Sequence, residues 1–87
     1  PTNALARFGL ANELLKAGES AEARTHLEAY LASYDDEGNG WLRLGDVCRD
    51  LGDTAAARAA WTRGIEAADR FGHPGMREEI EARLDAL

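Results

Sequence analysis

The chain has 87 residues, 45% hydrophobic and 30% charged, and ten Lys and Arg against sixteen Asp and Glu leave a formal charge of −6. This length suits a single domain of residues 1–87 with one modest core, and it is too short for a deep enclosed active site, so we do not expect an enzyme. The acidic balance argues against binding to nucleic acid or to an anionic membrane.

The composition favours helices and leaves almost no material for a sheet. The chain holds seventeen Ala and eleven Leu, whereas Val47, Ile65 and Ile80 are its only aliphatic β-branched residues. Alanine and leucine are strong helix formers, and β-branched residues are typical of strands. The sequence therefore predicts an all-α fold.

Two helices are predicted in the first part of the chain. Thr2 or Asn3 is suited to cap the first one, which should end before Gly18. Ser20 is suited to cap the second helix, which should run to about Tyr34. A polar, glycine-containing loop over 35–40 then separates these helices from the rest.

Three further helices follow this loop. Asn39 is expected to cap the third, which ends before Gly52, and Asp53 or Thr54 the fourth, which ends near Phe71. Gly72 is placed to terminate the fourth helix, and Pro74 to open a fifth that reaches the C-terminus. Connections this short predict antiparallel neighbours.

The chain also repeats itself. Residues 7–40 align with residues 41–74 without a gap, at an offset of 34. Among the positions where identical residues fall together are Leu10 and Leu44, Gly18 and Gly52, Ala21 and Ala55, Ala23 and Ala57, Arg24 and Arg58, and Asp35 and Asp69. The paired small residues are expected to let the helices of each hairpin approach closely, with Leu10 and Leu44 filling the space beside them.

The second copy resembles a tetratricopeptide repeat. It reads Trp41-x2-Leu44-Gly45-x2-Cys48 and then Ala57-x3-Trp61. It departs from the family pattern at Cys48, at Trp61 and at Asp69, where an aromatic residue, Phe and Pro are usual. The resemblance implies a right-handed α-α superhelix of two helical hairpins, with repeat 1 at about 4–37, repeat 2 at about 38–72 and a capping helix at about 74–87.

The last helix fits the repeat only after a shift. The unshifted alignment puts Glu78 and Glu79 in core positions, whereas a one-residue slip puts Met76 and Ile80 there. We prefer the slip, which leaves the acidic residues on the outside of a capping helix.

The resemblance implies a protein–protein interaction module in which the first helix of each hairpin lines a concave groove. Such a groove would hold a peptide or helix of a partner that carries apolar and acidic anchors, without catalysis or cofactor. The family's groove positions fall on eight residues: Phe8, Asn12, Leu15, Lys16, Leu42, Asp46, Arg49 and Asp50. Arg43, one residue past Leu42, borders the same face and is the ninth predicted groove residue. For Phe8, Leu15 and Leu42 the alternative is packing against neighbouring helices, and for the charged residues it is plain solvation.

The predicted groove admits two other interpretations. Some family members clamp a chaperone's C-terminal carboxylate with a set of Lys, Asn and Arg residues, but here only Asn12 matches in register, so we do not expect a clamp. The stronger alternative is homo-oligomerisation, because two repeats leave apolar surface on the groove and on the first hairpin.

Chemistry-bearing residues are few. His26, His73 and Cys48 do not have the spacing of a structural zinc site, so no metal is expected. Cys48 is the single cysteine, which rules out an internal disulfide, and its repeat position predicts a buried, inert thiol. With no apolar run long enough for a membrane span and no leader pattern, we expect a cytoplasmic protein.

Overall fold

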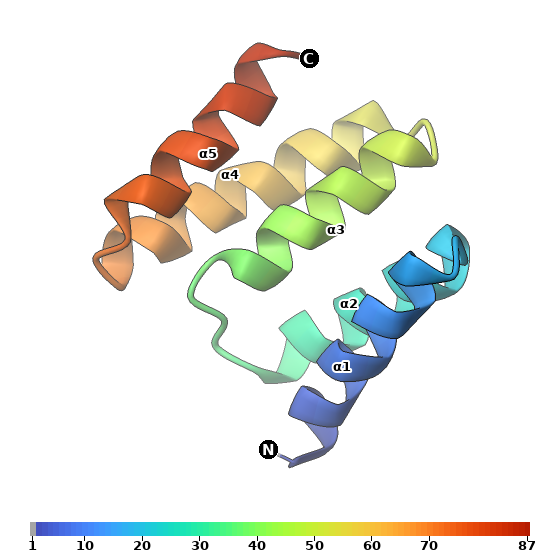
Figure 1. Cartoon of the computed structure of the whole chain (residues 1–87). Helices are drawn as coiled ribbons and strands as arrows, with labels where there is room; N and C mark the ends of the chain where they lie inside the picture. Colours follow the sequence, from blue (N-terminus) through green and yellow to red (C-terminus); the bar gives the residue numbers. More distant parts are fainter. Residues whose placement is uncertain (1) are drawn as a thin grey trace.

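The computed structural model describes residues 2–87, and over that range it consists of five α-helices without a strand (Figure 1). The helices are α1 Thr2–Lys16, α2 Ser20–Ser33, α3 Asn39–Asp50, α4 Thr54–Arg70 and α5 Pro74–Asp85. Each helix packs chiefly on the next one along the chain, which gives the hairpins α1–α2 and α3–α4 with α5 against α4. The predicted all-α fold with five helices is confirmed.

Three of the helices end as the glycine positions predict. Gly18, Gly52 and Gly72 have φ of 78°, 84° and 75°, a left-handed conformation that is strained for residues with a Cβ atom. At the first of these ends, the N–H of Gly18 donates to the carbonyl of Leu15 and the N–H of Glu19 donates to that of Leu14. The same pair of bonds recurs after α3 and α4, so the turns of both hairpins and the turn before α5 share one geometry.

The starts of the helices differ from the sequence prediction at two places. The residue that caps α2 is Glu19, and Ser20 is already helical; the residue that caps α3 is Gly38, and Asn39 is already helical. Asp53 caps α4 as expected, with its side chain accepting from the N–H of Ala56 at 3.1 Å. The residue that would cap α1 lies outside the described part of the chain, since that helix begins at Thr2.

A buried carboxylate, and not the side chain of Asn39, accepts hydrogen bonds from the backbone N–H groups at the start of α3. Asp36 is 6% exposed, and its Oδ2 accepts from the N–H groups of Gly38 and Gly40, each at 2.8 Å. Its Oδ1 accepts from the hydroxyl of Tyr30 at 2.5 Å. Because the first N–H groups of a helix lack partners within it, a carboxylate here is stabilised by hydrogen bonds and by the helix dipole. Asp36 therefore fixes the loop that joins the two hairpins.

The Tyr30 hydroxyl should resist ionisation. Burial, the hydrogen bond to Asp36 and the nearby negative charge of Asp36 all raise the pKa of Tyr30 above its ordinary value of 10.0. A raised pKa in the folded state means that the stabilisation is fully present below pH 10.0 and is lost as the pH rises through the folded-state pKa. We predict that in a Tyr34→Phe variant, which leaves Tyr30 as the single tyrosine, tyrosinate absorbance stays absent in the folded protein at pH 10.0 and appears only with alkaline unfolding. Ionisation of the folded protein at pH 10.0 would contradict this hydrogen bond.

The core of the second hairpin forms around Trp61, which is fully buried. Its indole Nε1 donates to the carbonyl of Leu42 at 3.1 Å, and its ring lies directly against Gly45. Leu27, at the equivalent position of the first hairpin, is also fully buried. The paired small and large residues of the repeat therefore pack as the sequence predicts.

The two leucines of the repeat do not share one environment. Leu44 is 7% exposed, in the core, whereas Leu10 is 46% exposed. The expectation that Leu10 fills the interior is wrong, and the reason is its place in the stack. Residues of α2 lie beside Leu44, but no earlier hairpin within the described residues covers the matching side of α1.

The capping helix adopts the slipped register. Ile80 is fully buried, with its side chain next to Gly64 of α4, and Met76 packs against the core. Glu78 and Glu79, which the unshifted alignment would bury, are exposed. The slip predicted from the sequence is therefore confirmed, although the helix ends at Asp85 and not at the C-terminus.

Candidate functional site

Helix α1 presents one exposed stripe beside a buried one. Ala4 and Ala11 are buried, and Phe8 and Leu15 of the same stripe pack against the core. Next to them lie Leu5, Asn12 and Lys16, whose spacing of seven and four residues keeps them on one side of the helix. Leu5 is 52% exposed, an apolar side chain that sequence reasoning did not include.

The three apolar residues predicted for the groove serve packing. Phe8 stacks on Tyr30, with the ring centroids 4.7 Å apart, and Leu15 is half-buried against the core. Leu42 is 7% exposed and contributes to the core cluster. For these residues the packing alternative describes what the structure shows, and a partner would reach little of Leu42.

Asn12 carries a polar atom without a partner. The residue is half-buried, and its Oδ1 is buried and accepts no hydrogen bond from any of residues 2–87. Such an atom keeps a desolvation cost of about 1–3 kcal/mol that a donor from outside would remove. Asn12 therefore marks a point on α1 where a bound N–H group would be stabilised once the half-buried side chain turns its Oδ1 outward.

Helix α3 brings its predicted residues to the surface in different states of pairing. Asp46 is half-buried and accepts from Arg83 of α5 at 2.7 Å, and Arg49 bridges to Asp50 at 3.2 Å. Arg43 is exposed and makes no ion pair with the described residues. The carboxylates on this helix are therefore already compensated, whereas the guanidinium of Arg43 is available to an anion.

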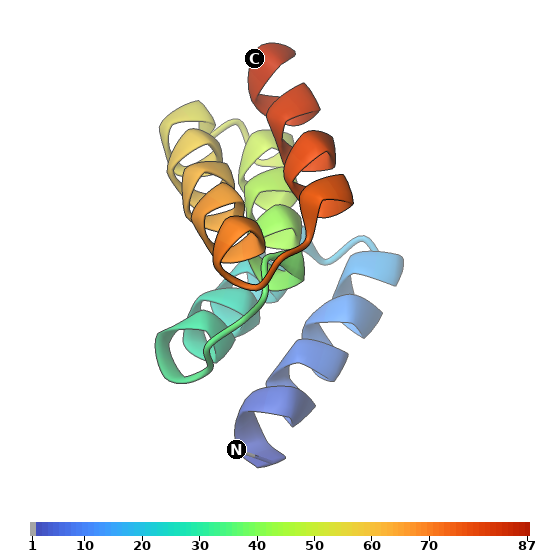
Figure 2. The same cartoon turned by 90° about the vertical axis from the view of Figure 1, so that its left-hand side faces the viewer.

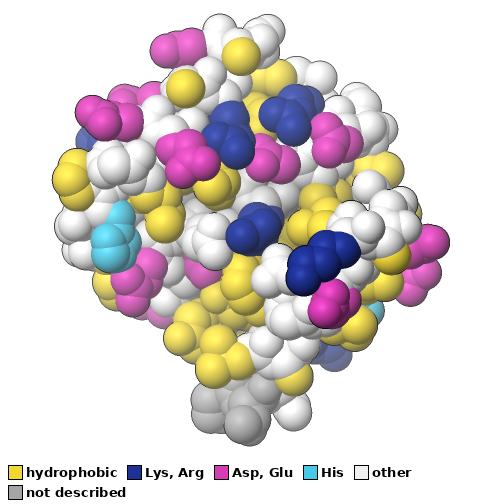
Figure 3. Space-filling model, viewed as in Figure 1, with side chains coloured by type: hydrophobic (Ala, Val, Ile, Leu, Met, Phe, Trp, Pro, Cys, Tyr) yellow, Lys and Arg dark blue, Asp and Glu magenta, His cyan; other side chains and the backbone are white. Residues whose placement is uncertain are grey.

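The helices that carry these residues lie on one side of the molecule. In Figure 2 this side is at the right, where α1 (blue) and α5 (red) lie, with α3 (green) set back between them. Figure 3 views the same side and shows apolar patches interrupted by separate cationic and acidic side chains. We call this surface the α1–α3 face and define it by six residues: Leu5, Asn12, Lys16, Arg43, Asp46 and Asp50.

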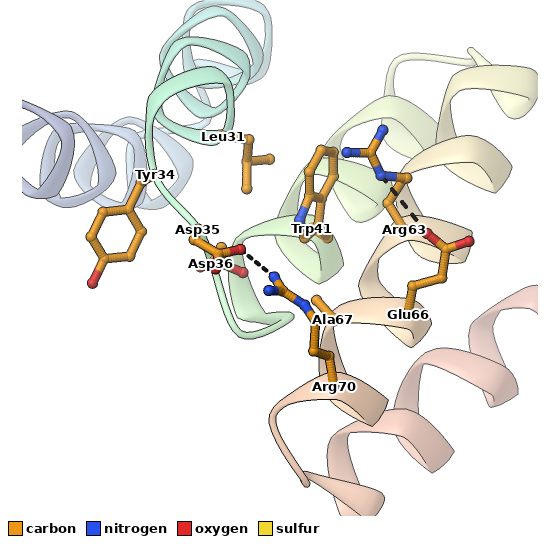
Figure 4. Close-up of a pocket in the computed structure, with 9 residues that line it drawn as sticks. All are labelled: Leu31, Tyr34, Asp35, Asp36, Trp41, Arg63, Glu66, Ala67 and Arg70. Atoms are coloured by element: carbon orange, nitrogen blue, oxygen red, sulfur yellow. Dashed lines mark hydrogen bonds and ion pairs between the residues drawn. The ribbon is translucent and has the colours of Figure 1, made fainter.

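A set of hollows lies elsewhere, in a crevice between α2 and α4. Three adjoining cavities of about 370, 490 and 200 Å³ share Trp41 and Arg63 as lining residues. Figure 4 shows the first of them, with Trp41 between Leu31 and the guanidinium of Arg63, which lies 4.7 Å from the indole centroid. None of the nine predicted groove residues lines these cavities.

The rim of this crevice is internally neutralised. Arg70 donates to Asp35, which ties α4 to the loop before α3, and Arg63 lies 3.9 Å from Glu66. Arg63 also covers the indole, a favourable placement of a cation over an aromatic ring. The crevice therefore functions as a seam between the two hairpins. The sequence signal that would have located it is the pair of Trp41 on α3 and Arg63 on α4, which both line all three cavities.

The remaining chemistry-bearing residues do not converge. Cys48 is buried and is the single free thiol, and burial raises its pKa, so the reactive thiolate is disfavoured. Among the described residues, no group of three or more His, Cys, Asp or Glu side chains is arranged to hold a metal ion. No helix of that part of the chain has the length and hydrophobicity needed to cross a bilayer.

Comparison with known proteins agrees with this architecture. Residues 8–73 match the tetratricopeptide repeat family. A TPR repeat-containing protein of Pseudomonas aeruginosa is 35% identical over 85 residues, which cover 98% of this chain and 81% of that protein. No solved structure gives a significant match.

Proposed function

The chain belongs to the tetratricopeptide repeat family, and from that premise we propose that it is a non-catalytic adaptor that holds a segment of a partner protein on the α1–α3 face. Repeats of this family generally mediate protein–protein interaction. A lone buried thiol needs no oxidising environment, and we place the adaptor in the cytoplasm.

The unpartnered Oδ1 of Asn12 is the observation that carries this proposal. An atom that accepts no hydrogen bond within the described chain lowers stability unless a ligand supplies a donor. It lies seven residues from the exposed Leu5 on the same stripe. A bound segment that places a backbone N–H near Asn12 can cover Leu5 at the same time.

The chemistry of the face defines the partner. Leu5 offers an apolar contact, Asn12 accepts an N–H group, and the uncompensated Arg43 attracts a carboxylate. An amphipathic helix or an extended segment with one apolar anchor and one Asp or Glu supplies the apolar contact, the N–H group and the carboxylate. Since Asp46 and Asp50 are occupied by arginines of this chain, a strongly basic segment gains less here.

A peptide selection tests the proposal. Displayed random peptides are selected on the wild-type protein, and the affinity of the enriched sequences is measured by fluorescence anisotropy. We expect Arg43→Glu to weaken binding at least about tenfold, because it replaces an attraction with a repulsion worth about 1.4 kcal/mol or more. Arg63→Glu, a matched reversal in the crevice, should leave the affinity within about twofold.

Asn12→Ala separates binding from stability. Alanine is the better helix former by up to about 0.7 kcal/mol, and the substitution removes the unsatisfied oxygen, so the melting temperature should stay equal or rise. Peptide affinity should fall. Peptides that lose affinity with Arg63→Glu and keep it with Arg43→Glu would refute the placement of the site.

The alternative use of the same face is self-association. It predicts that the protein is a dimer at the concentrations of the binding assay, and that Arg43→Glu dissociates this dimer. Light scattering on the wild type and on this variant decides between the two uses.

A further inference from the structure

The outer side of the first hairpin carries a hollow that the α1–α3 face does not include. A cavity of about 360 Å³ is lined there by five residues of α1 and α2: Asn3, Ala6, Arg7, Leu10 and His26. Leu10, 46% exposed, is its largest apolar side chain. The residues of α1 follow the spacing i, i+3, i+4 and i+7, so they form one continuous stripe.

The internal repeat allows this stripe to be compared with the equivalent stripe on α3. At an offset of 34, Arg7 and Leu10 correspond to Trp41 and Leu44 of α3. In the second hairpin this position is covered, since Glu28, Leu31 and Ala32 of α2 line the same cavity as Trp41 and Leu44. The stripe on α1 is therefore a surface on which a further helix can stack. No helix among residues 2–87 covers it.

The charge on this stripe is uncompensated. The Nη1 of Arg7 lies 3.4 Å from the Nδ1 of His26, and Arg7 makes no ion pair with a carboxylate of the described chain. A helix that covers Leu10 would therefore be favoured if it placed Asp or Glu near Arg7.

Helix α5, at the other end of the molecule (Figure 1), carries the complementary stripe. Its surface away from the buried Ile80 includes the exposed residues Glu78, Ala82 and Asp85, which follow the spacing i, i+4 and i+7. Both arginines of α5 are already engaged, Arg77 with Asp69 at 2.5 Å and Arg83 with Asp46 at 2.7 Å. Glu78 and Asp85 make no ion pair within the described residues, so the outer stripe of α5 is acidic, and Ala82 at its centre leaves room for a leucine.

We propose that α1 of one copy of this chain packs on α5 of a second copy, with Leu10 against the second copy's Ala82 and Arg7 between its two carboxylates. The contact joins different surfaces of the two copies, so it extends the stack of helices from one molecule into the next. It uses none of the residues of the α1–α3 face and goes beyond the adaptor function.

The expected association is weak and depends on salt. One leucine and one guanidinium per contact bury little surface compared with a stable dimer, and exposed ion pairs are screened by added salt. We therefore expect an average mass that rises with protein concentration and falls back when salt is added.

Sedimentation equilibrium with charge-reversed variants tests the contact. Wild-type protein is measured from about 20 µM to about 1 mM, together with Arg7→Glu and with the double variant Glu78→Arg, Asp85→Arg. Each variant alone should stay at the 9.4 kDa monomer mass, or its association constant should be at least about tenfold lower than that of the wild type. An equimolar mixture of the two variants should recover association, because the reversed end of one faces the reversed end of the other.

Arg58→Glu is the matched control. Arg58 is exposed on α4 and makes no ion pair with the described residues, so its reversal changes the net charge as Arg7→Glu does and should leave the association unchanged. Circular dichroism establishes that each variant is folded. A wild type that stays monomeric to about 1 mM, association that survives Arg7→Glu, or a mixture that stays monomeric would each overturn the proposal. Peptide binding to the α1–α3 face would be unaffected by any of these results.

Discussion

Replacing Gly45 with alanine should cost more stability than any other single methyl group added to this chain. A Cβ atom at Gly45 would lie less than 3.0 Å from three atoms of the Trp61 ring, and the ring has no room to withdraw because Trp61 is fully buried and bonded to the carbonyl of Leu42. Overpacking of this kind costs about 1–3 kcal/mol and sometimes more. A domain of this size is stable by roughly 4–13 kcal/mol in total. We expect a loss of about 3 kcal/mol, and Gly45→Val should leave the protein unfolded.

Gly9 provides the matched control for this substitution. It also lies within a helix, but a Cβ atom there would have nothing within 4 Å. Since alanine is favoured over glycine in helices by about 1 kcal/mol, Gly9→Ala should stabilise the protein. Urea unfolding of both variants measures the difference. Equal effects of the same sign at the two positions would show that Trp61 does not pack against Gly45.

Removal of the Asp36 carboxylate should produce the second largest loss. Asp36→Ala leaves two N–H groups at the start of α3 and the Tyr30 hydroxyl without their acceptor, in a place where water is largely excluded. Hydrogen bonds to a charged group contribute about 1.5–3 kcal/mol each, and part of this loss is recovered by water. We expect a decrease of about 3–4 kcal/mol in the free energy of unfolding.

The neighbouring aspartate is the control. Asp35 is exposed and pairs with Arg70, so Asp35→Ala should cost no more than about 1 kcal/mol. Thermal and urea unfolding of both variants, together with Tyr30→Phe and the double variant, measures how strongly Tyr30 and Asp36 are coupled. Additive effects of Tyr30→Phe and Asp36→Ala would mean that the two side chains do not interact.

The sequence predicts this fold well because its strongest signals are local. A glycine after each of α1, α3 and α4 sets the ends of these helices through φ alone, and an offset of 34 residues relates the hairpins. Two features of the fold depend on contacts between distant parts and were missed. Asp36 replaces Asn39 at the start of α3 because it accepts hydrogen bonds from Gly38, from Gly40 and from the hydroxyl of Tyr30. Leu10 differs from Leu44 because α2 covers only the latter.

The candidate site was less predictable because one residue along a helix turns the side chain by about 100°. Leu42 and Arg43 were placed on the same face from the family pattern, but Leu42 is in the core and Arg43 in solvent. Phe8, stacked on Tyr30, and the exposed Leu5 are three residues apart, which separates them by only about 60° around α1. Spacing therefore predicts which residues share a side of a helix, whereas the depth of each side chain depends on how the neighbouring helix packs.

Chemical-shift mapping tests the adaptor function most directly. The amide resonances of the labelled protein are assigned, and a selected peptide is titrated in. If the α1–α3 face holds the segment, the largest shifts will fall on Leu5, Asn12 and Arg43, while the amides of Trp41 and Arg63 at the crevice change little. Shifts concentrated around Trp41 and Arg63, with α1 unperturbed, would contradict the function proposed for this face.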